Sequence, residues 1–155
     1  MADVTITLIV DTTKLFLDPL LPLDECCTLA QIGGSLRADT NSDLTNYISD
    51  VNIGDTITWN GIANSTFLAT NVGSVMVNIT AVTVTTVFGQ AQLLPLSLIP
   101  GATGGTAVQG QVSFGSEGDT VTYTISFNFI TSVGDDVITS ETYNIDPKIR
   151  VHSTS

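Results

Sequence analysis

The strongest structural signal in this chain is a strict two-residue alternation over residues 120–130, TVTYTISFNFI. Large apolar side chains occupy the odd positions up to 129, and small polar side chains occupy the even positions up to 128. Successive side chains of a β-strand point to opposite faces of its sheet, so the segment is predicted to be a strand with one buried and one exposed face. The buried set is Val121, Tyr123, Ile125, Phe127 and Phe129, and the exposed set is Thr120, Thr122, Thr124, Ser126 and Asn128.

Further segments read as strands, and almost none of the chain has a helical period. They are residues 4–10, 44–51, 56–61, 75–88, 107–114 and 137–145, with a short last piece at 148–152. Turn residues separate them at intervals of about eight to twelve residues. This pattern predicts one domain over residues 1–155, an all-β antiparallel β-sandwich of about seven to nine strands.

Two long segments break the alternation, and both are predicted to be loops. Residues 11–42 hold scattered leucines and two prolines without a clean helical period, which predicts an excursion packed on the body, with room for one short helical turn. Residues 89–105 contain Pro95 and Pro100. Proline has no N–H to donate to a ladder, so this segment is not a central strand along its whole length and is expected to cover a sheet edge or a sandwich end.

Two segments share a Gly-Asp-Thr pattern followed by an aromatic residue, GDTITWNG at 54–61 and GDTVTYTI at 118–125. The first predicts a tight reversal between strands 44–51 and 56–61, forming a hairpin that places Trp59 in the core. The likeness has two interpretations, a duplicated hairpin or convergence on the same turn chemistry. The flanking sequences do not match, which favours convergence.

The uncharged stretch VMVNITAVTVTTVF at 75–88 is rich in β-branched residues, which favours strand pairing. By parity, its inward residues are Val75, Val77, Ile79 and Ala81 in the first half, and Val82, Val84 and Phe88 in the second. The apolar set changes face between Ala81 and Val82, which predicts a β-bulge there or a strand that crosses between sheets. The alternative is burial on both faces, the second face against another subunit.

Charge is scarce and one-sided in this sequence. Fifteen Asp and Glu residues oppose four Lys and Arg residues, the formal net charge is −11, and 12% of residues are charged against roughly 25% in ordinary soluble domains. No basic stripe exists to neutralise phosphates, so binding to nucleic acid or to an anionic membrane is not expected. Residues 56–116 contain no Asp, Glu, Lys, Arg or His. The surface of this central part must therefore be neutral.

The start of the chain, MADVTITLIVD, alternates like a strand and lacks the basic region and continuous apolar stretch of a secretory signal. No apolar run approaches the roughly 18 residues that cross a bilayer as a helix. A cytoplasmic location is therefore expected.

Catalytic signatures are missing from the sequence. The single histidine, His152, lies near the C-terminus, where chains tend to fray. No Gly-x-Ser-x-Gly elbow is present, and no phosphate-binding glycine motif precedes a helix. We therefore expect no enzymatic activity and no cofactor other than a calcium ion.

The calcium hypothesis rests on acidic residues in two predicted turns, Glu117 with Asp119 and Asp135 with Asp136. Carboxylate oxygens are preferred Ca²⁺ ligands, so the four side chains form a site if the two turns meet. Consecutive hairpin turns normally lie at opposite ends of a sandwich. Ordinary polar turn residues are therefore the alternative interpretation.

The two cysteines, Cys26 and Cys27, are adjacent in sequence, a spacing that disfavours a disulfide between them. Reduced thiols are expected, either as small, partly buried side chains or as ligands of a soft metal. Packing is favoured, because His152 is the only available nitrogen partner.

Short motifs follow one another in a characteristic order. They are Val-Asp-Thr at 10–12, a proline-containing loop, GDTITW at 54–59, a proline-rich middle and Tyr-x-Ile-Asp-Pro-x-Ile-x-Val at 143–151. This order resembles the bacterial inclusion-body protein family of the PixA and AidA type. The resemblance implies a β-sandwich and an abundant, non-enzymatic, intracellular protein that can self-associate. This chain differs from the family in its uncharged centre and in having Ile145 where an aromatic residue is commoner.

The surface chemistry favours the same function. Monomeric sandwiches protect their edge strands with lysine, proline or inward charges, and residues 56–116 offer no charge for this purpose. The leading hypothesis is a structural protein that assembles with copies of itself, as a fibre, tube, inclusion or homo-oligomer. The residues assigned to that contact are Val82, Thr83, Val84, Thr85, Lys148 and Arg150. The alternative is a soluble binding module whose end loops hold Ca²⁺, a glycan or a protein ligand.

Overall fold

Strands make up nearly all of the regular structure, and they lie in two sheets. The computed structural model describes residues 3–18, 20–33, 44, 47–63, 72–84, 92–100, 105–114, 118–133 and 136–152. These residues form eleven strands, one short α-helix and one 3₁₀ turn. One sheet has five strands and the other has six.

The five-stranded sheet is arranged around the first strand of the chain. Its strand order is β2 (Cys27–Gly33), β1 (Asp3–Val10), β4 (Thr56–Ala63), β7 (Thr106–Phe114) and β6 (Gln92–Pro100). β1 pairs antiparallel with β2 and parallel with β4. β2 and β6 therefore form the two edges of this sheet.

The six-stranded sheet is built on its longest strand, β8 (Thr120–Val133). One edge of β8 pairs with β5 (Val72–Val84). The other edge pairs in turn with β11 (Lys148–His152), β10 (Tyr143–Ile145) and β9 (Asp136–Thr139). β3 (Ile48–Asn52) pairs parallel with β11 and completes the sheet.

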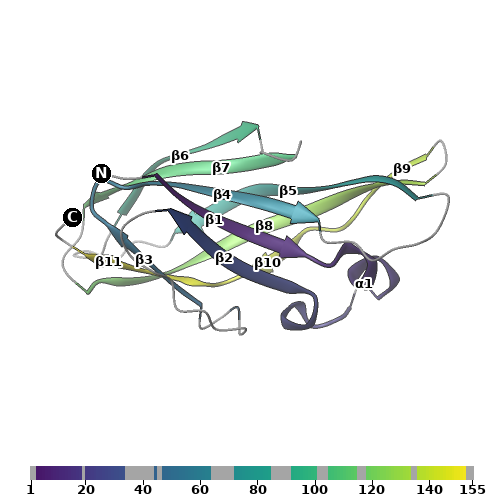
Figure 1. Ribbon diagram of the computed structural model, residues 1–155, viewed down its shortest axis with the longest axis horizontal. Coiled ribbons are helices and arrows are strands. Elements are labelled where there is room, and N and C mark those ends of the chain that lie inside the picture. The colour runs from purple at the N-terminus through teal and green to yellow at the C-terminus, as the bar shows by residue number, and fades with distance from the viewer. Residues whose placement is uncertain are drawn as a thin grey trace.

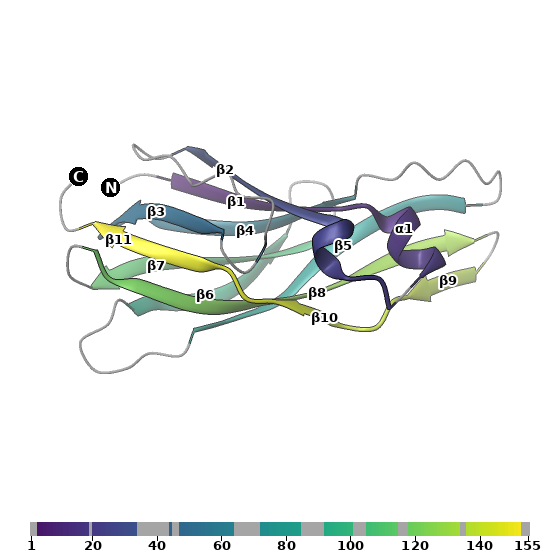
Figure 2. The same ribbon diagram turned by 90° about the horizontal axis from the view of Figure 1, so that it is seen from below.

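The strands run along the long axis of the molecule, as Figures 1 and 2 show. Both ends of the chain lie at one end of this axis. The short helix α1 (Thr12–Leu17) and the hairpin strand β9 lie at the opposite end. The two ends of the sandwich are therefore built from different elements.

The core lies between the sheets and follows the predicted alternation. The odd residues of 121–129 on β8 are all buried, with exposed fractions of 4% or less. Trp59 on β4 is fully buried, and its indole N–H donates a hydrogen bond of 3.1 Å to the Tyr123 hydroxyl of β8. This bond joins the two sheets through the middle of the core.

The all-β sandwich is thus confirmed, and two details of the prediction are corrected. The described residues contain eleven strands rather than seven to nine. The sheets are also mixed rather than wholly antiparallel, because β1 runs parallel to β4 and β3 runs parallel to β11. Alternation is a property of a single strand, so it carries no information about the direction of the neighbouring strand.

The predicted hairpin of residues 44–51 and 56–61 is wrong, because β3 and β4 belong to different sheets. The segment between them is nevertheless a tight reversal. Gly54 has a φ of +95°, a conformation that favours glycine. Its N–H donates to the carbonyl of Val112, and the Val112 N–H donates back to the carbonyl of Asp55.

The second Gly-Asp pair repeats this arrangement. Gly118 has a φ of +85°, its N–H donates to the carbonyl of Val151, and the Val151 N–H donates to the carbonyl of Asp119. β8 follows this pair and lies in a different sheet from β7. The repeated motif is therefore a turn that carries the chain from one sheet to the other, and not a duplicated hairpin.

Both predicted long loops contain strands. Within residues 11–42, α1 and the 3₁₀ turn (Leu23–Glu25) are followed by β2, an edge strand. The sequence of β2, CTLAQIG, has no clean alternation, because an edge strand is buried less completely than a central one. The expected short helical turn is present as α1.

Within residues 89–105, β6 is also an edge strand, so the prediction of a loop is wrong for residues 92–100. The prediction that this segment is not a central strand is correct. The register of β6 against β7 shifts between Leu94 and Ser97, on either side of Pro95. An edge strand accommodates proline because its outer N–H groups need no ladder partner.

The predicted irregularity in residues 75–88 is confirmed in β5. The register against β8 slips between Ile79 and Ala81, so Thr80 is the inserted residue. Ile79 and Val82 are both buried, whereas Ala81 is exposed. The bulge lies slightly earlier than predicted, and it changes which residues face the core.

Candidate functional site

The outer face of the five-stranded sheet, here called the neutral face, presents polar but uncharged side chains. Residues that lie opposite each other in a ladder share a face, so the strand registers define its members. Apart from Asp3 at the start of β1, the described side chains on this face carry no charge. Thr7 and Asn60 of this face are buried. The members that are at least partly exposed are Thr5, Ile9, Thr28, Ala30, Ile32, Thr56, Thr58, Ile62, Gln109 and Gln111.

Two long side chains of the neutral face, Gln109 and Gln111, are held in place by hydrogen bonds within the chain. The Gln109 amide donates to the Thr58 hydroxyl at 3.2 Å, and the Gln111 amide donates to the carbonyl of Gly54 at 3.1 Å. Side chains that are already ordered lose less conformational entropy when a partner covers them. Removing neutral groups from water also costs less than removing charged groups. The neutral face is therefore suited to packing against another surface.

The predicted contact residues at 82–84, which lie on β5, have different surroundings. Val82 is buried, and Val84 is half-buried against the core. Thr83 is exposed on the outer face of the six-stranded sheet. Thr85 lies outside the described residues. Of this group, the structure therefore presents Thr83 to solvent and uses Val82 and Val84 for the interior.

The predicted contact residue Arg150 is engaged within its own chain. Its guanidinium donates from Nε to Asp50 Oδ1 at 2.6 Å and from a terminal nitrogen to Asp50 Oδ2 at 3.0 Å. His152 Nε2 lies 2.9 Å from the same Oδ1 and donates to it, because an ionised carboxylate only accepts. These residues meet because β3 and β11 pair parallel with Asp50 opposite Arg150.

This cluster perturbs the carboxyl group at its centre. Burial by itself raises the pKa of Asp50, but the hydrogen bonds and charges of Arg150 and His152 outweigh that effect and lower it below its ordinary value. β11, which also carries the half-buried Lys148, pairs with β8 on one side and β3 on the other. Its backbone is therefore occupied within the sheet.

The acidic residues of the calcium hypothesis are not brought together where they are described. Asp119 immediately precedes β8, and Asp136 pairs with Val133 at the other end of that strand. The 14 residues of β8 separate them by roughly 40 Å. Glu117 and Asp135 lie outside the described residues. No group of three or more His, Cys, Asp or Glu side chains that could hold a metal occurs in the described part of the chain.

The two thiols are free and buried. Cys26 ends the 3₁₀ turn, Cys27 begins β2, and their Sγ atoms are 3.7 Å apart. Burial raises the pKa of both thiols, most strongly that of Cys27. Protonated, enclosed thiols are poor nucleophiles and poor metal ligands. Their surroundings favour a packing role.

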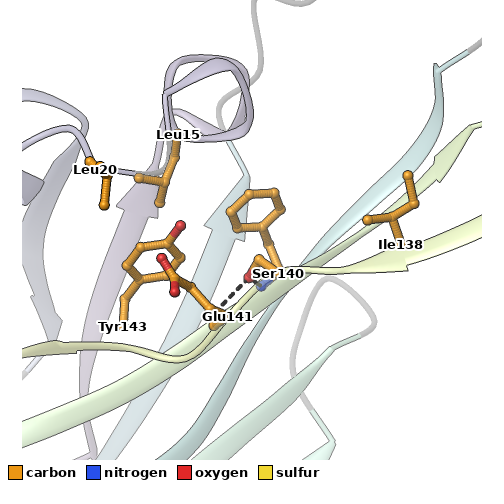
Figure 3. Close-up of a pocket in the computed structure, with 7 residues that line it drawn as sticks. Leu15, Leu20, Ile138, Ser140, Glu141 and Tyr143 are labelled. Carbon is orange, nitrogen blue, oxygen red and sulfur yellow. Dashed lines mark hydrogen bonds between the residues drawn. The ribbon is translucent and has the colours of Figure 1, made fainter.

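A pocket of about 450 Å³ opens at the end of the sandwich that holds α1 and β9, as Figure 3 shows. Leu20 and Ile138 at this pocket are 88% and 43% exposed. Phe129 and Tyr143 are buried side chains of the same lining. The full lining is Leu15, Leu20, Phe129, Ile138, Ser140, Glu141 and Tyr143.

The polar groups of the pocket have defined partners. The Ser140 hydroxyl accepts from the Phe129 N–H and donates to the carbonyl of Glu141, each at 2.9 Å. Burial, and then the Glu141 carboxylate, raises the pKa of Tyr143. The pocket thus combines apolar walls with one carboxylate, an arrangement that matches small amphipathic molecules with a positive group.

Sequence reasoning missed this pocket and the Asp50 cluster. The leucines of residues 11–42 were the available signal for the pocket, but its other wall comes from β8, β9 and the segment before β10. No local pattern connects Asp50 to Arg150, which is 100 residues away.

No helix in the described ranges has the length and apolar composition needed to cross a membrane. No protein-family model matches the chain, and no curated protein matches it. Among solved structures, a crystal structure of an inclusion body protein (PixA) from Burkholderia cenocepacia J2315 has a similar fold, with a TM-score of 0.63 at 15% sequence identity. The alignment covers 96% of this chain and 94% of that chain. The resemblance predicted from the sequence is therefore confirmed at the level of the fold.

Proposed function

We propose that this chain is a non-enzymatic structural protein that assembles with copies of itself through the neutral face. The observation that carries the proposal is the composition of that face. Across four neighbouring strands it offers hydroxyl, amide and aliphatic groups, and Asp3 is the one charge among its described side chains. Two copies of a chain with a net charge of −11 repel each other, and contact through an uncharged surface keeps the acidic groups apart.

Two further observations support the proposal. A protein with the same fold is described as an inclusion body protein, although the two chains share only 15% of their residues. The single histidine is bound to Asp50, whose carboxylate is also held by Arg150. This arrangement stabilises the pairing of β3 with β11, and so gives the imidazole a structural use.

Light scattering after size-exclusion chromatography, followed by electron microscopy over a concentration series, tests the proposal. We expect the wild-type chain to form species larger than a monomer as concentration rises. Thr58→Glu on the neutral face should shift this transition to higher concentration, because it places like charges in the contact. Thr122→Glu, an exposed position on the other sheet, is the matched control and should leave assembly unchanged. A wild-type chain that stays monomeric throughout would sink the proposal.

A second candidate function, binding of a small ligand by the end pocket, is favoured by the pocket itself. Exposed apolar side chains that gather at one cavity, as Leu20 and Ile138 do, mark binding sites more often than single exposed ones. The single carboxylate of Glu141 favours a ligand with an ammonium group and an apolar chain over an anionic one.

Nuclear magnetic resonance titration with hexylammonium, hexanol and hexanoate tests this second function. The pocket predicts shifts at Ile138 and Tyr143, with the tightest binding for hexylammonium. Glu141→Gln should remove the preference for the cation and retain the binding of hexanol. If none of the three compounds shifts these resonances, the pocket is not a ligand site of this class.

A further inference from the structure

We propose that a second copy of this chain pairs with the free edge of β2, antiparallel and about a two-fold axis, so that the two five-stranded sheets become one continuous sheet. The inference rests on the proposed self-assembly and names the contact that forms the first dimer. It rests on the backbone geometry of β2, whereas the proposed function rests on the side chains of the neutral face.

β2 is a regular and unprotected edge. It makes seven consecutive antiparallel pairs with β1 without a register shift, and no other described strand pairs with it. Its sequence, CTLAQIG, contains no charge and no proline. Proteins that stay monomeric usually interrupt such an edge with a bulge, a proline or a charged side chain.

The other long edges carry such interruptions. On β6, Pro95 and Pro100 remove two donors, and the register shifts around Pro95. On β5, the carbonyl of Ile79 at the free edge accepts a hydrogen bond of 3.1 Å from the Thr106 hydroxyl. These contacts leave no comparable length of open backbone on either strand.

The short edge strand β3 is also partly covered. Its Asp50 carbonyl accepts from the Gln31 side chain at 3.0 Å. β3 has five residues, against seven in β2. Among the edges compared, β2 is therefore the one with no proline, no register shift and no contact to its outer backbone groups from the described part of the chain.

Hydrogen bonding at the start of β2 shows which of its groups point outward. The Asp11 N–H donates to the carbonyl of Cys26 at 2.7 Å, and this pair continues the β1–β2 register by one step. Hydrogen-bonded and non-hydrogen-bonded pairs alternate along an antiparallel ladder. Ala30 therefore bonds to β1, whereas the N–H and C=O groups of Leu29 and Gln31 point to the free edge.

A second copy of β2 complements these groups. Full antiparallel overlap is centred on Ala30, so Leu29 of each copy lies opposite Gln31 of the other and each pair exchanges hydrogen bonds. Ile32, which is 67% exposed, then lies opposite Thr28 of the second copy and is partly covered. The strand has no charges, so this symmetric pairing brings no like charges together.

Hydrogen exchange measured residue by residue on the wild-type chain tests the inference without any mutation. In dilute solution, the amides of Leu29 and Gln31 should exchange quickly and that of Ala30 slowly. At concentrations where the chain assembles, the amides of Leu29 and Gln31 should become protected as well. Packing through the neutral face alone forms no hydrogen bonds to these two groups, so their exchange would stay fast.

Disulfide cross-linking provides a second measurement. Ala30→Cys places two thiols opposite each other at the axis, so mild oxidation should give a covalent dimer several-fold faster than in the control. Ile32→Cys is that control, because it lies on the same strand and the same face but opposite Thr28. The buried native thiols should give no cross-link in the wild-type chain.

The outcomes separate this inference from the proposed function. A wild-type chain that never assembles overturns both. A chain that assembles while Leu29 and Gln31 remain unprotected, or while Ile32→Cys cross-links as fast as Ala30→Cys, overturns the pairing of β2 and leaves self-assembly standing.

Discussion

Arg150 binds Asp50 through two parallel hydrogen bonds of 2.6 and 3.0 Å, although 100 residues separate them in the sequence. The pair bridges the parallel strands β11 and β3, where the two residues lie directly opposite each other. The Asp50 side chain is 9% exposed and the Arg150 side chain is 36% exposed, so the contact is partly shielded from water. This interaction fixes the edge strand β3 to the rest of its sheet.

Asp50→Asn is expected to destabilise the fold by about 1–3 kcal/mol, because it removes the charge that Arg150 and His152 bind. Urea denaturation followed by circular dichroism measures the change in the free energy of unfolding. Asp3→Asn makes the same substitution at an exposed position and should change it by less than about 0.5 kcal/mol. Equal effects of the two variants would contradict a stabilising role for the pair.

The same pair predicts how stability depends on pH. The folded state lowers the pKa of Asp50, so the unfolded chain, with a carboxyl pKa of about 3.9, takes up the proton more readily. The contribution of Asp50 is therefore complete above the unfolded value and is lost as pH falls through the folded value. The difference in stability between wild type and Asp50→Asn should shrink below pH of about 4. A difference that stays constant from neutral pH into this acid range would refute the linkage.

Tyr123→Phe removes only the oxygen that accepts the Trp59 indole hydrogen bond and leaves a buried N–H without that partner. A loss of about 1–3 kcal/mol in the free energy of unfolding is expected. The chain has one tryptophan, so its fluorescence follows the unfolding directly. Trp59→Phe should cost less in the Tyr123→Phe background than in the wild type, because the two residues are coupled. Additive effects would indicate that the bond contributes nothing.

Gly61→Ala is expected to destabilise the packing of β4 on β5. A Cβ at this position would lie 2.5 Å from Val77 Cγ1 and 3.2 Å from the Val77 carbonyl oxygen. Overpacking of this kind typically costs about 1–3 kcal/mol. Val77→Ala removes the clashing methyl groups, so thermal denaturation of the double variant should show less than the sum of the two single effects. If the double variant lost as much stability as the two single variants together, the contact with Val77 would not be the source of the strain.

The local pattern of residues determined the strands and their buried faces. Residues 120–130 alternate strictly, and the structure buries the residues that this pattern assigns to the core. The register slip in β5 could also be predicted, because a change of the buried face changes which positions of the sequence are apolar. The neutral surface could be predicted as well, because a segment without charged residues cannot place charges on the surface.

Tertiary structure alone decided which strands are neighbours. The pattern of one strand does not specify its partner, so sequence reasoning joined β3 to β4 in a hairpin, whereas the turn at Gly54 carries the chain between sheets. It also treated β2 as part of a loop, because an edge strand needs no strict alternation. Register sets Asp50 opposite Arg150 and leaves the amides of Leu29 and Gln31 at an open edge. Such relationships depend on contacts between distant segments, which form only when the two sheets pack together.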